Sequence, residues 1–348
     1  MRPVYRIFVN ISIIVAAIAV FVLIPAAESA SGAFGSGERL TYRLKWLFNM
    51  SVVGDLYAHK HKLFAEHGLD VTIKEGGPER DAIRELELGR AQFGVASADQ
   101  VIRAISRGAS VVVIAQIFQI NPLQWIYRAD IPRIQRLADL RGKTIGITYG
   151  GNDETIMKTL LARAGILDDE VRLFSVRYDY TPFYRHKVDI WPVYLNVQGV
   201  IINEKLRNAG ERVLFFNPAE FGVQFVANSV VTSEQMIKER PDTVQRFTKA
   251  LLQGWAEALD RANTEKTIET IQQFDRHTPT GILKKQLSAT RKLIMPAPGT
   301  KIGTINITAW KETEKIMLEQ KRIPEPVLVH NRLVDVHGLK VEKVEIGK

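Results

Sequence analysis

The chain has 348 residues, of which 46% are hydrophobic and 24% charged, and a formal net charge of +9 at pH 7. This composition excludes an intrinsically disordered chain and a multi-spanning membrane protein, and the length permits two domains. The absence of cysteine excludes disulfides, thiolate metal sites, a cysteine nucleophile and a lipid-anchored bacterial lipoprotein. Because the lysines and arginines are spread along the chain, we expect a solvated basic surface and no nucleic-acid partner.

The N-terminal segment has the residue order of a bacterial secretory signal. Arg2 and Arg6 precede an apolar run at residues 7–24, and small residues follow from Pro25. This order predicts a signal peptide and short linker over residues 1–33, with cleavage close to residues 27–29. The alternative is an uncleaved anchor, because the apolar run borders on membrane-spanning length. We therefore expect an exported, periplasmic protein.

Strands and helices alternate along the first part of the remaining chain. We expect strands at residues 39–48, 69–74, 93–96, 110–116 and 124–128, and helices at residues 54–67, 79–88 and 99–106. Alternation at this spacing predicts βα units and a mainly parallel sheet.

The pattern restarts at residues 143–152, KTIGITYGGN. Alternating isoleucines predict a short buried strand, Gly150 and Gly151 a sharp turn, and Asn152 or Asp153 the cap of a helix that runs to residue 164. Such a turn leaves backbone N–H groups directed at open space, which suits the carboxylate, phosphate or carbonyl oxygen of a small ligand. The alternative is a tight connection between strand and helix that binds nothing.

Further strands are expected at residues 171–178, 188–194 and 199–202, with a short helix at 182–185. Residues 222–231 read as a strand that returns to the first part of the chain. Thr232 and Gln235 have capping-box spacing, and an amphipathic helix begins near Pro241, with a mainly helical pattern to about residue 320.

This order predicts two lobes, one inserted into the other. Lobe 1 comprises residues 34–128 and 222–330, lobe 2 comprises residues 129–221, and residues 331–348 form a C-terminal tail. The chain would cross between the lobes near residues 124–128 and 222–231. A ligand would then bind in the cleft where strand ends and helix N-termini converge.

Several segments resemble a known family. Trp46 with Asn49, the segment FAEHGLDV at residues 64–71, the segment DLRGKTIGI at residues 139–147 and the segment GTINITAW at residues 303–310 are similar to substrate-binding proteins of ABC importers. The groups with the greatest similarity are those for nitrate, sulfonate and taurine and those for thiamine pyrimidine precursors. The resemblance covers about residues 40–323 and implies an α/β, type II periplasmic-binding-protein fold, with mainly parallel sheets in two lobes joined by a two-crossing hinge.

The resemblance also implies a pocket at the ends of several strands and at the glycine turn. The candidate ligand-binding residues are Trp46, Asn49, Ser97, Asp99, Gly150, Gly151, Asn152, Asp153, Tyr178, Trp191, Tyr194, Asn196 and Gln198. Aromatic side chains would supply stacking area, and amides and backbone N–H groups would orient a planar or polar molecule. For each aromatic residue the alternative is ordinary core packing.

Two departures from the family pattern limit the function. Binders of pyrimidine precursors tend to carry a carboxylate near the position of Gln198, so the neutral amide puts that ligand in doubt unless Asp153 or Glu154 replaces it. Related eukaryotic enzymes use a lysine and a histidine after the third strand and a cysteine-rich loop. This chain has Ala96 and Gln100 there and no cysteine, so we expect no enzyme activity.

The resulting prediction is a monomeric, periplasmic solute-binding component of an ABC importer. It would capture a small organic molecule, such as a thiamine pyrimidine precursor, a sulfonate or taurine, and deliver it to the permease subunits, which the ATPase subunit drives. It would need no cofactor and no metal. The alternative is an extracytoplasmic ligand-sensing subunit on the same clamp fold.

Overall fold

The computed structural model describes residues 37–77, 79–177 and 179–334, which belong to one compact unit of the chain. The predicted signal segment, Tyr178 and residues 335–348 of the predicted tail lie outside the described residues. Within the described ranges no helix is both long and apolar enough to cross a membrane.

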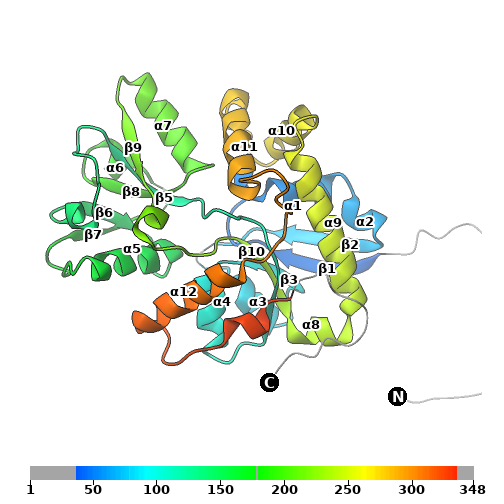
Figure 1. The fold of residues 1–348 in the computed structure, drawn as a ribbon. Helices are drawn as coiled ribbons and strands as arrows, with labels where there is room; N and C mark the ends of the chain where they lie inside the picture. Colours follow the sequence, from blue (N-terminus) through cyan, green and yellow to red (C-terminus); the bar gives the residue numbers. More distant parts are fainter. Residues whose placement is uncertain (1–36, 78, 178, 335–348) are drawn as a thin grey trace, which may run out of the picture. The chain divides into compact units, whose positions relative to one another are not determined.

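The first sheet has five strands in the order β2-β1-β3-β10-β4 (Figure 1). These strands are β1 (Glu38–Arg43), β2 (Leu69–Lys74), β3 (Phe93–Ala96), β4 (Val111–Gln116) and β10 (Ser229–Ser233). β1 pairs in parallel with β2 and β3, whereas β10 pairs antiparallel with β3 and β4. The strand β10 therefore runs opposite to the other four strands of this sheet.

The second sheet has five strands in the order β7-β6-β8-β5-β9. These strands are β5 (Leu123–Arg128), β6 (Thr144–Ile147), β7 (Arg172–Ser175), β8 (Ile190–Tyr194) and β9 (Val213–Phe216). Here β6 pairs in parallel with β7 and β8, and β5 pairs antiparallel with β8 and β9. The mainly parallel α/β class predicted from the sequence is confirmed, with one reversed strand in each sheet.

The reversed strands are the first ones that the chain forms after crossing between the sheets. Residues 117–122 carry the chain from β4 to β5, and residues 222–228 carry it back to β10. Figure 1 shows these two links between the blue-cyan and green groups of elements.

The helices that accompany the first sheet come from both ends of the chain. They are η1 (Met50–Val52), α1 (Val53–Lys60), α2 (Leu63–Glu66), α3 (Ala82–Glu87), α4 (Ala98–Ile105), α8 (Glu234–Glu239), α9 (Pro241–Leu259), α10 (Thr264–Gln272), α11 (Thr280–Ile294), α12 (Ile307–Glu319) and η4 (Val329–Arg332). The second sheet is accompanied by η2 (Leu137–Leu140), α5 (Asn152–Arg163), α6 (Thr181–Tyr184), α7 (Gln198–Asn208) and η3 (Pro218–Phe221).

The apolar face of α9 anchors one side of the first sheet. The Phe247 ring stacks on the Phe93 ring of β3 with centroids 3.6 Å apart, and it also meets Tyr42 edge-on at 5.1 Å. All three residues are fully buried. The four-residue spacing of large apolar side chains in this helix predicted this packing.

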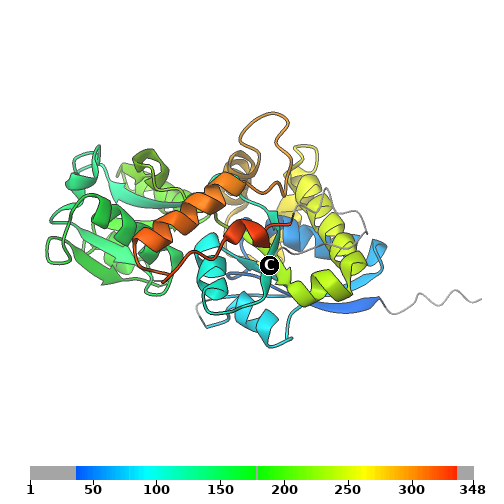
Figure 2. The same ribbon diagram turned by 60° about the horizontal axis from the view of Figure 1, so that its bottom comes forward.

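A second hydrophobic cluster joins elements of both sheets. It contains Val113 of β4, Ile145 of β6, Leu160 of α5 and Trp310 of α12. Figure 2 shows α12, in orange, extending from the first-sheet elements toward the green elements of the second sheet. The late helix α12 therefore contributes to the packing of both parts.

Four sequence predictions are corrected by the structure. The boundary after residue 128 assigned residues 123–128 to lobe 1, but β5 pairs with β8 and β9 in the second sheet. Residues 199–202 lie in α7 and form no strand. The helix expected over residues 54–67 is two helices, because Lys62 adopts a left-handed φ of 61°. The cap of α8 is Ser233, whose Oγ accepts from the N–H of Met236, rather than Thr232.

Candidate ligand-binding site

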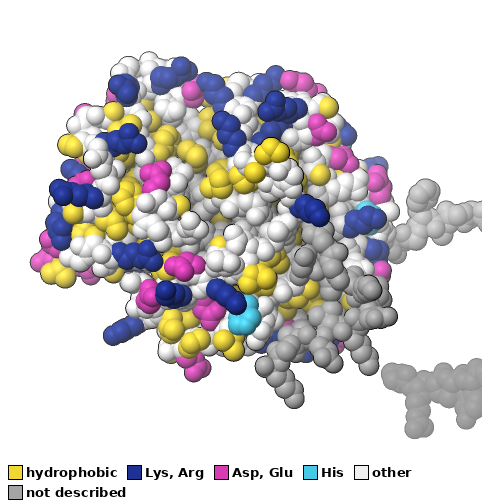
Figure 3. Space-filling model, viewed as in Figure 1, with side chains coloured by type: hydrophobic (Ala, Val, Ile, Leu, Met, Phe, Trp, Pro, Cys, Tyr) yellow, Lys and Arg dark blue, Asp and Glu magenta, His cyan; other side chains and the backbone are white. Residues whose placement is uncertain are grey.

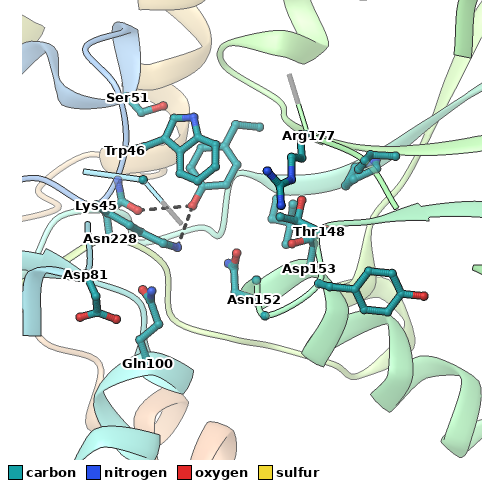
Figure 4. Close-up of a pocket in the computed structure, with 18 of the residues that line it drawn as sticks. Lys45, Trp46, Ser51, Asp81, Gln100, Thr148, Asn152, Asp153, Arg177 and Asn228 are labelled. Carbon is teal, nitrogen blue, oxygen red and sulfur yellow. Dashed lines mark hydrogen bonds between the residues drawn. The ribbon is translucent and has the colours of Figure 1, made fainter. Parts of the chain in front are cut away.

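A cavity of about 650 Å³ lies between the two sheets. Its wall is formed by the segments that follow β1 and β6, by parts of α3 and α4, and by β8 with the residues around it. Figure 4 shows side chains from both sheets directed into this space. The volume is within the range of about 300–1,000 Å³ that is usual for small-molecule sites.

Nine of the thirteen candidate residues line the cavity. They are Trp46, Asn49, Gly150, Gly151, Asn152, Asp153, Trp191, Tyr194 and Gln198. The structure therefore brings the segment after β1, the glycine turn and the β8 region together, although their role in binding stays a prediction.

Three of the remaining candidates lie outside the cavity lining and hold local structure. Ser97 and Asp99 are buried at the start of α4, where Ser97 Oγ donates to Asp99 Oδ1 at 2.6 Å. Asn196 is fully buried, and its Nδ2 donates to Oγ1 of Thr290 at 2.9 Å. These three side chains do not belong to the cavity lining, and Tyr178 lies outside the described residues.

The glycine turn between β6 and α5 does not present the open N–H groups that its sequence predicted. Gly150, with φ 79°, donates its N–H to Oε2 of Glu154 at 2.8 Å, and Gly151 donates to the carbonyl oxygen of Thr148 at 2.8 Å. The N–H of Thr148 donates to Oδ2 of Asp153. The chain thus satisfies these donors with its own carboxylate and carbonyl oxygens, and the prediction of a ready-made anion nest is wrong for Gly150 and Gly151.

Asp153 is a buried carboxylate at the cavity wall. Burial raises the pKa of its carboxyl group to about 6, while the N–H of Thr148 and, more weakly, the positive charge of Lys45 act in the opposite direction. Lys45 belongs to the first-sheet part and Asp153 to α5, so their charges act on each other across the cavity.

Two aromatic side chains of the wall pack against each other. Trp191 is buried and packs beside Tyr180 and Phe183, with ring centroids 5.8 and 6.1 Å away. Burial raises the pKa of Tyr180 to about 12, so this phenol is neutral. Because Trp191 is almost completely buried, it presents only part of its ring to the cavity.

Two of the lining amides hold local structure. Asn49 caps η1, because its Oδ1 accepts from the N–H of Ser51 at 2.8 Å and its Nδ2 donates to the carbonyl of Leu47. Gln198 Oε1 accepts from the N–H of Tyr194 at 3.1 Å and fixes the end of β8. Both side chains are held in place by the backbone of their own segment.

Polar contacts across the cavity floor join the two sheets. Lys45 Nζ donates to Oη of Tyr194 at 3.3 Å, and Tyr194 Oη donates to Oδ1 of Asn228 at 3.4 Å (dashed lines in Figure 4). Lys45 and Asn228 adjoin strands of the first sheet, whereas Tyr194 ends β8 of the second.

Sequence reasoning missed several polar or aromatic residues of the wall. Five of them are Lys45, Gln100, Arg177, Tyr180 and Asn228. Each lies close to the end of a strand or the start of a helix, which is the one signal that could have indicated them. Among the residues that the structure describes, no group of three or more histidine, aspartate or glutamate side chains is placed to hold a metal ion.

Positive charge also occurs outside the cavity. On the face in Figure 3, lysine and arginine side chains gather above α7, α10 and α11. The net charge of the chain is therefore not concentrated at the cavity alone.

The arrangement of two α/β lobes around this cavity is the type II periplasmic-binding-protein fold. The aliphatic sulphonate-binding protein SsuA from Escherichia coli has a TM-score of 0.68 at 15% identity, covering 89% of this chain and 96% of SsuA. The desulfurization enzyme DszB has a TM-score of 0.57 at 13% identity, covering 86% and 96%. The fold is therefore shared by binding proteins and by at least one enzyme.

Sequence comparison gives the family. The model described as NMT1/THI5 like matches residues 49–264, more than half of the chain, so this protein belongs to the NMT1/THI5-like family. The riboflavin-binding protein RibY of Chloroflexus aurantiacus is 23% identical over 87% of this chain and 87% of RibY. The formylaminopyrimidine-binding protein of Halalkalibacterium halodurans is 24% identical over 84% of this chain and 89% of that protein. The family resemblance predicted from the sequence is confirmed.

Proposed function

We propose that this protein is the solute-binding component of an ABC importer, which captures a small organic molecule between its two sheets and delivers it to a permease. The observation that carries the proposal is the cavity of about 650 Å³ whose wall combines aromatic rings and polar side chains from both sheets. The similarity of this chain to a riboflavin-binding protein and to a formylaminopyrimidine-binding protein supports it.

The two-sheet wall provides a mechanism for capture. A ligand that contacts Trp46 on one side and Asn152 on the other favours the arrangement in which both walls are close. It can shift this equilibrium only by the difference between its affinities for the closed and open forms. The closed, loaded form would then be the one that the permease recognises.

The proposal includes export to the periplasm and binding without catalysis. The order of charged, apolar and small residues over positions 1–33 supports export. The lack of cysteine removes one class of nucleophile, which supports a role in binding rather than in catalysis. We propose a monomer, because each chain contains both walls of its cavity.

The compounds named by the relatives are the first ligands to test. Riboflavin, a formylaminopyrimidine and an aliphatic sulfonate should each be titrated into the purified full chain by calorimetry, and a wider metabolite set should follow by thermal shift. We expect at least one small molecule to bind in a 1:1 ratio and to raise the unfolding temperature, because binding to the native state stabilises it.

A matched pair of variants locates the binding. Trp46→Leu should weaken the binding of that compound, whereas Phe274→Leu, which alters an exposed ring outside the cavity, should not. Equal effects of both substitutions, or no bound molecule across the whole set, would contradict the proposed function.

A further inference from the structure

Three hydrogen-bond donors converge in one part of the cavity. Lys45 follows β1, Gln100 lies in the first turn of α4, and Asn152 is the first residue of α5. Figure 4 shows these side chains directed toward the same space from the two sheets. We refer to Lys45, Gln100 and Asn152 as the donor cluster.

Lys45 supplies a positive charge that lacks a carboxylate partner. Its Nζ donates to Oη of Tyr194 at 3.3 Å and lies 5.9 Å from the centroid of that ring. Within the described part of the chain, no carboxylate oxygen comes within 4.0 Å of this ammonium group, and it is partly buried. A partly desolvated cation that forms no direct ion pair favours an anion at this place.

Gln100 adds a donor whose orientation is fixed. Its Oε1 accepts from the backbone N–H of Ser97 at 3.1 Å, in the capping box of α4. Because Oε1 is bonded to Ser97, the Nε2 group of Gln100 is the part of the amide that can donate to a molecule in the cavity.

Asn152 adds a donor that is buried and unsatisfied. Its Nδ2 atom is shielded from solvent and has no hydrogen-bond partner among the residues that the structure describes. Leaving a buried N–H₂ group without an acceptor is unfavourable, so an acceptor atom of a ligand would relieve it.

The carboxylates of the cavity wall are already engaged. Asp81 accepts two backbone N–H groups as the cap of α3, Glu87 pairs with Arg84, and Asp153 accepts from the N–H of Thr148. By contrast, Arg107 and Arg177 line the cavity and form no ion pair with any described residue. Arginines without an ion pair thus line this wall beside carboxylates that already have partners.

Aromatic rings flank the donor cluster. Trp46 comes from the first-sheet part, and Tyr180, Trp191 and Tyr194 come from the second. Rings on both sides of a space favour a flat π-system between them, through offset or edge-to-face contact.

We propose that the cavity takes a planar aromatic compound that carries an anionic group, with the anion held by Lys45, Gln100 and Asn152 and the ring held by the flanking aromatic side chains. This inference rests on the proposed solute-binding function and specifies the charge and shape of the ligand.

The test compares compounds that differ in one property. Benzoate and 2-naphthoate should be titrated by calorimetry into the full chain beside their uncharged amides, benzamide and 2-naphthamide, and beside cyclohexanecarboxylate, which has the charge without the aromatic ring. We expect at least one aromatic acid to bind about 10- to 100-fold more tightly than its amide, as charge-assisted hydrogen bonds imply. The same acid should bind more tightly than cyclohexanecarboxylate.

Variants assign the charge preference to the donor cluster. Lys45→Met should remove most of the difference in affinity between acid and amide. Asn152→Asp keeps the shape of the side chain but replaces a donor by a negative charge, so it should also weaken the binding of the acid relative to wild type. Lys292→Met is the matched control, because Lys292 lines a separate groove between α7 and α11 and should leave binding unchanged. Urea unfolding of each variant shows that a loss of binding is not a loss of folding.

The outcomes separate this inference from the proposed function. If amides bind as tightly as acids, if no acid binds, or if Lys45→Met keeps the preference while folded, the inference is wrong. Binding of riboflavin or another neutral compound under those circumstances would leave the solute-binding function intact. Failure of every charged and neutral compound to bind would contradict both.

Discussion

The hydroxyl group of Tyr194, at the end of β8, donates a hydrogen bond to Oδ1 of Asn228, directly before β10, at 3.4 Å. The same hydroxyl accepts from Lys45 Nζ at 3.3 Å. One phenol of the second sheet is therefore joined to two side chains of the first-sheet part, on the floor of the cavity.

Tyr194→Phe should weaken this connection without emptying the space that the ring fills. We expect the free energy of unfolding in urea to fall by about 1 kcal/mol, the usual net contribution of a hydrogen bond of this kind. Tyr149→Phe is the control, since Tyr149 is exposed and should change stability by less than about 0.5 kcal/mol. An equal loss in both variants would show that the Tyr194 hydroxyl makes no particular contribution.

Long, periodic helices were predictable from the sequence, because their pattern and their packing agree. The apolar positions of α9 recur every fourth residue and face the first sheet, so the local signal and the tertiary contact favour the same structure. The strand β6, the glycine turn and α5 were predictable for the same reason.

Residues 199–202 show where local pattern failed. The run Gly-Val-Ile-Ile reads as a strand, yet it forms the first turns of α7. Gln198 at the start of this helix accepts from the N–H of Tyr194, and Gln286 of α11 donates to the carbonyl of Val197 at 3.3 Å. The contact with Gln286, which is distant in sequence, is one that the local strand preference of β-branched residues does not contain.

The candidate site was predictable only in part. The glycine turn reaches the cavity, but Glu154, which follows it in the sequence, accepts from the N–H group of Gly150 that the turn was expected to offer. A single lysine such as Lys45 belongs to no periodic pattern or motif in the sequence. It lies opposite Asn152 only because the fold brings the segments that contain them together at the cavity.

Close contact between α1 and α9 gives a second prediction. A Cβ atom at Gly54 would lie 2.1 Å from Cδ2 of Trp255, and one at Gly254 would lie 2.4 Å from Cβ of Ala58. Gly54→Ala should therefore lower the free energy of unfolding by about 1–3 kcal/mol or more, because the two helices must separate. Gly281→Ala is the matched control in α11, where no atom lies within 4 Å, and it should stabilise by up to about 1 kcal/mol. Chemical unfolding of both variants distinguishes crowding from a general effect of replacing glycine.

The segment after α12 is held by one carboxylate, which gives a third prediction. Glu314 Oε1 accepts from the N–H groups of Val327 and Leu328 at 2.6 and 2.8 Å, and Oε2 accepts from that of Val329 at 2.9 Å. Glu314→Gln removes the charge and one of the two acceptor oxygens, so we expect a loss of about 1–3 kcal/mol. Amide hydrogen exchange should show faster exchange at residues 327–329. Glu319→Gln, at an exposed position of the same helix, should leave those amides protected.

Asp55 gives a prediction of pH dependence. The side chain is buried beside Tyr42, whose Oη donates to Oδ1 of Asp55 at 2.6 Å. Burial raises the pKa of the Asp55 carboxyl group from 3.8 to about 7, although the hydrogen bond from Tyr42 opposes the rise. Between about pH 4 and pH 7 the folded chain holds a proton that the unfolded chain has released. The contribution of Asp55 to the free energy of unfolding is therefore complete below pH 4 and is lost as the pH rises to 7, by an amount on the order of 4 kcal/mol.

Asp55→Asn removes this titration and keeps a side chain of similar shape. Urea unfolding at several pH values should show that wild type loses more stability than the variant between pH 4 and pH 7, whatever the contribution of other groups to both proteins. Asp153→Asn should remove a smaller part of the loss of stability with rising pH. The part that it removes should end nearer pH 6, because burial raises the pKa of Asp153 only to about 6. Parallel stability curves for wild type and Asp55→Asn would show that Asp55 does not retain a proton in the folded chain over this range.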